Sequence, residues 1–166
     1  TDAVAAYYDV LRRDSTLVRP HLELCRLYGP LRLHDGAKAK QQGDLALRQY
    51  RALGARAGEA QALWCLADAL NGGNRDEQNE SRADADRARA IFEELAYPYN
   101  LSRAFNYVAL AAAAQGNFTQ AVDAWTTSLK WATATANEAL RPAIVSNLAV
   151  LYSNLGDLPH ALSSLQ

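Results

Sequence analysis

The chain has 166 residues, 49% of them hydrophobic, and its 17 basic and 18 acidic side chains give a formal net charge of −1 at pH 7. This balance provides no large field of one sign, so we expect no nucleic-acid binding by this chain. No apolar run approaches the roughly 18 residues that a membrane-spanning helix needs, so we expect no membrane span.

Apolar residues at helical spacing alternate with short breaks rich in glycine, proline and asparagine, whereas strand-forming residues are sparse. This pattern predicts an all-α protein of about nine helices. The expected helices are 2–13, 17–29, 37–53, 58–71, 81–96, 101–115, 118–135, 138–155 and one that starts at Pro159. Residues 71–80 are expected to form a surface loop, with Ser81 capping the helix that follows. Asn117 and Gln120 are expected to form a capping box.

The chain repeats itself about every 40 residues. A small residue recurs at positions 25, 67, 109 and 149, in steps of 42, 42 and 40. A second register of alanines, at 46, 88, 121 and 161, is followed four residues later by a large side chain. Two interleaved helical registers on one period indicate stacked helix hairpins, in which the small residues allow close approach. We therefore expect one domain, with a leading helix 2–13 and repeats 17–57, 58–100, 101–137 and 138–166.

Two segments carry a family resemblance. Residues 147–158 with Ala161, and residues 107–118 with Ala121 and Trp125, resemble the tetratricopeptide repeat (TPR) in the order of leucine, small residue, aromatic, glycine turn and alanine. The resemblance implies a right-handed α-solenoid of antiparallel helix hairpins, a TPR-like superhelix. In the two earlier repeats the small residues are 21 rather than 12 positions apart. Their loops or second helices are therefore expected to be longer.

The spacing and residues 52–63 are similar to divergent repeats of bacterial signalling proteins, which often precede a diguanylate cyclase, LuxR-type DNA-binding or histidine kinase domain. This resemblance implies a non-catalytic, protein- or peptide-binding sensory region. A self-associating scaffold or adaptor, or the regulatory TPR region of a transcriptional regulator, is the alternative. Because the chain starts at Thr1, has no methionine and ends within a helical register, we expect it to be part of a longer polypeptide.

In the family, the first helix of each pair lines a concave groove that holds a peptide or a partner helix. The corresponding candidate contact residues are Arg19, Arg26, Trp64, Asp68, Arg103 and Asn106. Arginine binds carboxylates, asparagine bonds peptide backbone and tryptophan supplies apolar contact. The alternative is that these positions are ordinary groove surface. The lysine–asparagine clamp of chaperone-tail receptors is absent. A homodimer through Tyr97, Tyr99 and Trp131 is the second possibility.

Little in the sequence indicates catalysis. The three histidines fall in different repeats, and no zinc, phosphate-loop or nucleophile motif occurs. We therefore predict no catalytic residue, metal or cofactor. The acidic run 76–86 is interleaved with arginines, which favours an ion-paired, solvated helix face over a calcium site. Cys25 and Cys65 are the only cysteines and are expected to be reduced packing residues of a cytoplasmic protein.

Overall fold

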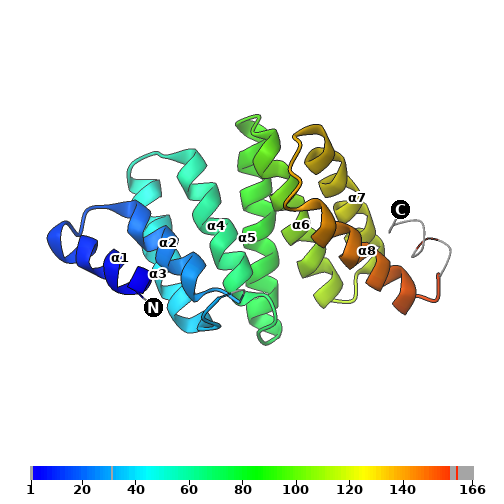
Figure 1. Cartoon of the computed structure of the whole chain (residues 1–166), viewed down its shortest axis with the longest axis horizontal. Helices are drawn as coiled ribbons and strands as arrows, with labels where there is room; N and C mark the ends of the chain where they lie inside the picture. The colour runs from blue at the N-terminus through cyan, green and yellow to red at the C-terminus, as the bar shows by residue number, and fades with distance from the viewer. Residues whose placement is uncertain (1, 31, 158–159, 161–166) are drawn as a thin grey trace. The chain divides into compact units, whose positions relative to one another are not determined.

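The computed structural model describes residues 2–30, 32–157 and 160. These residues form eight α-helices and no strand, which confirms the all-α prediction (Figure 1). The helices are α1 (Asp2–Arg13), α2 (Val18–Tyr28), α3 (Gly36–Ala52), α4 (Arg56–Leu70), α5 (Arg75–Glu94), α6 (Pro98–Ala114), α7 (Phe118–Ala134) and α8 (Arg141–Asn154). The ninth helix, expected from Pro159, lies outside the described residues. None of the described helices has the length and apolar character needed to cross a membrane.

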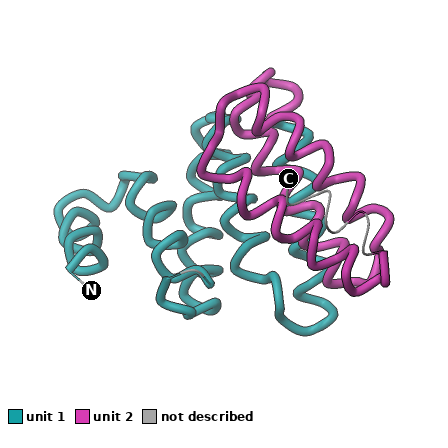
Figure 2. Tube along the Cα trace, turned by 45° about the vertical axis from the view of Figure 1, so that its right-hand side comes forward, with its two compact units in different colours: residues 1–91 teal, residues 92–166 magenta. Residues whose placement is uncertain are grey.

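The chain divides into two compact units, residues 1–91 and 92–166 (Figure 2). In unit 1, α1 packs on α2, α2 on α3 and α3 on α4, and α2 also contacts α4. In unit 2, α6 packs on α7 and α7 on α8. These neighbouring helices thus contact each other within each unit, the local arrangement that hairpin repeats require.

The small residues of both registers are buried, as the repeat predicts. In the first register, the exposed fractions are 0% for Cys25, 1% for Ala67, 0% for Ala109 and 9% for Ala149. In the second register, Ala46, Ala88 and Ala121 are at most 1% exposed, whereas Ala161 lies outside the described residues. Short side chains at these positions let neighbouring helices approach closely, so they set the packing distance within each unit.

Five helix ends share one backbone motif. A residue with positive φ follows each of the helices α3, α5, α6, α7 and α8. The next residue donates its N–H to the carbonyl five positions earlier, as Asn117 does to Ala112 and Asn137 to Ala132. This is the Schellman arrangement, which satisfies the last carbonyls of a helix. The positive-φ residues are Gly54, Ala96, Gly116, Ala136 and Gly156. The repeat is therefore visible in the turns as well as in the core.

Two of these positions carry alanine, whose Cβ disfavours the left-handed region by about 1–2 kcal/mol. Replacing Ala136 (φ 50°) by glycine removes that penalty, whereas the extra backbone entropy of glycine costs about 0.5–1 kcal/mol. We expect Ala136→Gly to raise the free energy of unfolding by about 0.5–1 kcal/mol in urea denaturation. Ala83→Gly, at an exposed position inside α5, is the control and should lower it by about 1 kcal/mol.

The prediction of a surface loop over residues 71–80 is wrong, because α5 begins at Arg75. Asn74 Oδ1 accepts hydrogen bonds from the N–H groups of Asp76 and Glu77 at 2.9 and 3.1 Å. Glu77 Oε2 accepts from the Asn74 N–H at 2.8 Å. These reciprocal bonds form a capping box and start the helix six residues earlier than predicted. Ser81, the expected cap, is 2% exposed and instead donates to the Ala67 carbonyl at 2.7 Å.

Other boundaries also differ from the prediction. α6 begins at Pro98 rather than at residue 101, because proline is well suited to the first helical position. Asn117 precedes α7 but makes no side-chain capping bond, so the expected capping box with Gln120 is wrong. The longer early repeats are accommodated as predicted, by the connection 29–35 in the first and by the 20-residue helix α5 in the second.

Candidate interaction surface

The predicted contact residues fall on three helices, α2, α4 and α6. Arg19 and Arg26 lie on α2, and Trp64 and Asp68 lie on α4, all within unit 1. Arg103 and Asn106 lie on α6 in unit 2. The structure joins α2 and α4 directly, since Arg26 Nη2 donates to Gln61 Oε1 of α4 at 3.4 Å.

Along α2 the arginines share one carboxylate. Arg19 Nε lies 2.6 Å from Glu23 Oε1, and Arg26 Nη1 lies 3.0 Å from the same oxygen. The side chains of Arg19 and Arg26 remain 68% and 37% exposed. The hydrogen bond that Arg19 Nε donates to the Glu23 carboxylate raises the pKa of Arg19 above its ordinary value. We call Arg19, Glu23, Arg26 and Gln61 the α2–α4 polar row; its net charge is positive.

Glu23 was missed in the sequence analysis. Glu23 follows Arg19 by four residues and precedes Arg26 by three, the helical spacings at which opposite charges meet. This spacing could have predicted the ion pairs from the sequence. Tyr50 of α3 lies within electrostatic range of the row, and burial raises its pKa. Its ring lies against Gly58, where a Cβ atom would clash with it. The close contact between Tyr50 and Gly58 thus joins α3 to α4.

Two of the predicted contact residues are largely covered. Trp64 is 7% exposed, so most of its ring packs inside unit 1. Asn106 is also 7% exposed, and its Oδ1 accepts a hydrogen bond from Trp125 Nε1 at 3.0 Å. Asp68 is half-buried, with its carboxylate next to Gly29. Solvent therefore reaches the guanidinium groups of Arg19 and Arg26 more than it reaches Trp64 and Asn106.

Arg103 lines a pocket in unit 2. The other lining residues are Tyr99 of α6 and Asn137, Ala139 and Leu140 of the α7–α8 connection. The cavity volume is about 130 Å³. Asn137 is 5% exposed, and its Nδ2 donates to Ser102 Oγ at 3.2 Å. The sequence analysis did not associate residue 137 with Arg103, because 34 residues separate them in the chain.

Cys25 and Cys65 form a disulfide, with their Cα atoms 6.4 Å apart, so the prediction of two reduced cysteines is wrong. The bond links α2 to α4 and is buried, at 0% and 7% exposure for the two residues. The physical reason is the repeat itself. Forty residues separate the cysteines, which is about one period of the sequence repeat, and they lie on α2 and α4, two helices that contact each other. That separation was the available signal.

The remaining titratable side chains form small local sets. Arg87 pairs with Asp84 at 3.3 Å and Arg89 with Asp86 at 3.8 Å, which confirms that the charged run of α5 is laced with ion pairs. Asp84 is nevertheless 5% exposed, and burial raises its pKa. Among the described residues, no group of three or more histidine, cysteine, aspartate or glutamate side chains is arranged to hold a metal ion.

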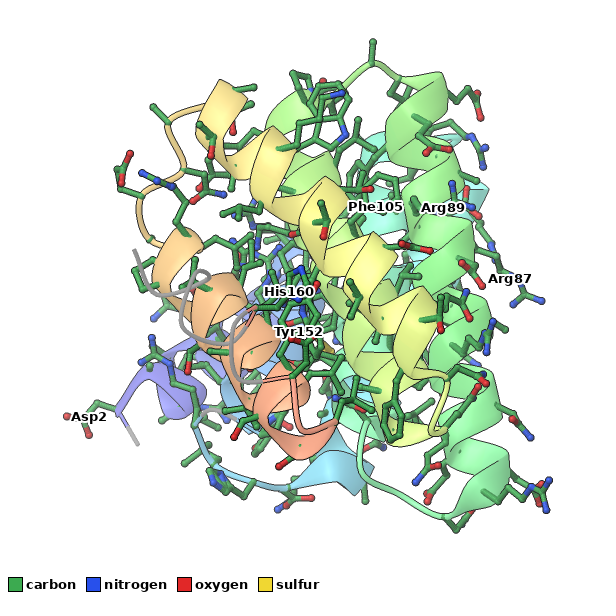
Figure 3. The ribbon with its side chains drawn as sticks, turned by 90° about the vertical axis from the view of Figure 1, so that its right-hand side faces the viewer. Asp2, Arg87, Arg89, Phe105, Tyr152 and His160 are labelled. Carbon is green, nitrogen blue, oxygen red and sulfur yellow. A yellow bond between two sulfur atoms is a disulfide. The ribbon has the colours of Figure 1, made fainter. Side chains whose placement is uncertain are left out.

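Two of the three histidines, His21 and His160, have side-chain partners in the described part of the chain. His21 Nδ1 lies 2.8 Å from Gln42 Oε1. His160 pairs with Asp157 at 2.8 Å, and its ring stacks on Tyr152 with centroids 5.3 Å apart (Figure 3). These contacts account for the positions of both rings without requiring a ligand.

Over the residues described, these observations define an all-helical protein of consecutively packed helices, with a disulfide and a polar row in unit 1 and a small pocket in unit 2. No family model matches the chain, and no curated protein is significantly similar to it. The TPR resemblance therefore enters below as a proposal.

Proposed function

We propose that this chain is a non-catalytic module that binds a protein or peptide, built as a right-handed TPR-like α-solenoid. The observation that carries the proposal is the α2–α4 polar row, which joins the first helices of two consecutive hairpins through the bond between Arg26 and Gln61. Exposed guanidinium groups on adjacent helices suit an extended partner, because each offers several hydrogen-bond donors in a fixed geometry.

In this mechanism, Arg19 and Arg26 bind carbonyl or carboxylate oxygens of the partner. Glu23 holds both guanidinium groups in place while the row is empty. A partner carboxylate then competes with Glu23 for one arginine, which favours acidic segments over basic ones. Asp68 adds an acceptor on α4.

The biological setting follows from the resemblance. We propose that the module is the sensory or interaction region of a bacterial signalling protein, such as a diguanylate cyclase, or the regulatory region of a transcriptional regulator. The proposed location is the cytoplasm. The disulfide is evidence against that location, because cytoplasmic thiols are normally kept reduced. Thiol labelling of the protein in intact cells tests the location, because a reduced, labelled pair of cysteines is expected in the cytoplasm and an unlabelled disulfide outside it.

The test begins with peptides selected from a random library on the intact protein. We expect Arg26→Glu to weaken the selected peptides at least tenfold, or about 1.4 kcal/mol, as measured by fluorescence anisotropy. Arg48→Glu makes the same charge change at an exposed position on α3 and is the matched control. Unchanged affinity in Arg26→Glu, or an equal loss in Arg48→Glu, would contradict binding at the row.

Self-association is the second candidate. Tyr97 and Tyr99, on either side of Pro98, are 48% and 50% exposed. Exposed aromatic side chains are typical of contact surfaces. Sedimentation velocity over a range of concentrations separates a dimer from a monomeric receptor. A single species of monomer mass at every concentration excludes this candidate.

A further inference from the structure

The amino-terminal helix α1 is attached to unit 1 by one narrow stripe of side chains. Figure 1 shows α1 at one edge of the unit, beside α2. None of its residues is buried, whereas every other described helix contains buried side chains. Its half-buried side chains are Val4, Tyr7, Tyr8 and Leu11. This is the i, i+3, i+4, i+7 spacing with which an amphipathic helix presents one apolar face to a groove.

The surface beneath this stripe is apolar and belongs to α2 and α3. It consists of Leu24, Tyr28 and Ala39, and all four side chains of the stripe pack against it. Leu24 and Ala39 are 0% exposed in the presence of α1, and Tyr28 is 8% exposed. A hydrogen bond between the hydroxyl groups of Tyr8 and Tyr28 adds a polar contact and raises the pKa of Tyr8 to about 12. We call Leu24, Tyr28 and Ala39 the α1-binding surface.

The helices that carry the α1-binding surface are joined to each other independently of α1. Leu24 precedes Cys25, whose disulfide with Cys65 links α2 to α4. The helix α3 packs on both α2 and α4. A side-chain contact of 2.8 Å between His21 Nδ1 and Gln42 Oε1 also joins α2 to α3. We therefore expect these three helices to keep the surface in place when α1 leaves it.

The connection between α1 and α2 is suited to act as a hinge. Residues 14–17 are all exposed. Asp14 Oδ1 accepts hydrogen bonds from the N–H and the hydroxyl of Thr16 at 2.9 and 2.6 Å, so this turn is closed within the connection itself. Leu17 makes no side-chain capping bond to α2. Pro20, in the first turn of α2, has no N–H with which to extend that helix backwards, so the break persists when α1 moves.

We propose that the α1-binding surface is an interaction site for a helix of another protein, and that α1 occupies it in the absence of that partner. The partner is an amphipathic helix with apolar or aromatic side chains at i, i+3, i+4 and i+7, including a tyrosine at i+4. This is the pattern that the surface accepts from α1. Arg26 is two residues from both Leu24 and Tyr28, and residues two apart do not share a helix face. The proposal is therefore independent of peptide binding at the α2–α4 polar row.

A fluorophore-labelled peptide of residues 2–13 stands in for the partner helix in an anisotropy titration of the full chain. Leu11→Asp in the chain places a charge within the stripe and should release α1. We expect this variant to bind the peptide saturably and at least tenfold more tightly than the wild type, in which α1 competes at a high local concentration. Val10→Asp makes the same change at an exposed position of α1 and should behave as the wild type. No saturable binding to the Leu11→Asp chain, or equal binding by all three proteins, would overturn the proposal.

Variants of the peptide test how it is recognised by the Leu11→Asp chain. A peptide with Leu11→Asp should lose binding, whereas a peptide with Val10→Asp should keep it. Tyr8→Phe in the peptide and Tyr28→Phe in the chain should each weaken binding by about three- to tenfold. The two together should weaken it no more than either alone, because both remove the same hydrogen bond. Effects that multiply would contradict recognition through Tyr8 and Tyr28.

Hydrogen exchange of the wild-type chain tests the release of α1 without any substitution, which also covers the case in which circular dichroism shows that Leu11→Asp is unfolded. Amides of α1 should exchange at least tenfold faster than those of α2, because α1 opens by itself. Equal exchange rates in the two helices would mean that they open together and would refute the proposal. Sedimentation velocity identifies the other possible occupant. A wild-type dimer that Leu11→Asp abolishes would assign the surface to α1 of a second copy and overturn the assignment to another protein.

Discussion

Replacing Cys25 and Cys65 together by serine is expected to lower the free energy of unfolding of unit 1 by about 4 kcal/mol. The two cysteines are 40 residues apart in the chain, and closing a loop of that size restricts the unfolded chain by about 4 kcal/mol in the chain-entropy model. The bond also joins α2 to α4, which contact each other within unit 1. Losing it therefore weakens that contact.

Urea denaturation with and without a reductant measures this effect. The reductant should bring the wild-type midpoint close to that of the double variant and leave the double variant unchanged. Each single variant should lose a similar amount, because one remaining thiol closes no loop. Two results would show that the bond does not form. One is the detection of two free thiols per chain in the denatured, unreduced protein, and the other is a wild-type urea midpoint that does not change when the reductant is added.

Trp125→Ala is expected to destabilise unit 2 by about 3–5 kcal/mol. The indole is 4% exposed, and its N–H donates to Asn106 Oδ1, which is itself buried. The substitution therefore leaves both a large cavity and an acceptor without its donor. The measurement is the free energy of unfolding by circular dichroism, with the half-buried Trp131→Phe as the control for losing an indole.

A double-mutant cycle separates the cavity from the hydrogen bond. Trp125→Phe keeps most of the ring but leaves Asn106 unsatisfied, at a cost of about 1–3 kcal/mol. Asn106→Leu should lower stability by a similar amount, because the indole N–H then has no acceptor. Combining the two should cost less than their sum. Strict additivity would mean that the bond between Trp125 and Asn106 contributes nothing to stability.

The result for Asn106 also affects the sequence-based prediction of binding. That position was predicted to contact a peptide because the resemblance assigns it to the groove. Its amide oxygen accepts a buried hydrogen bond from Trp125, 19 residues away in the chain. The peptide contact stays a prediction. A helical register identifies which face a residue occupies, but it does not identify its partners. The exposed Arg19 and Arg26 retain the predicted role as a testable proposal.

Local signals along the chain were sufficient for most of the fold. Helical periodicity and turn residues such as Gly54 and Gly116 predicted the helices, because both act within a few residues. The recurring small residues correctly predicted which positions are buried. The start of α5 was misjudged because Gly72 and Gly73 favour a loop, whereas the capping box of Asn74 and Glu77 outweighed them.

The amino-acid sequence by itself therefore determined the helical class, the repeat period and the buried registers. Only the tertiary structure decided that Cys25 and Cys65 are bonded and that Asn137 lies beside Arg103. The physical reason is distance along the chain. Helix propensity, capping and periodicity depend on residues within one or two turns, whereas disulfides and pockets depend on which helices pack together.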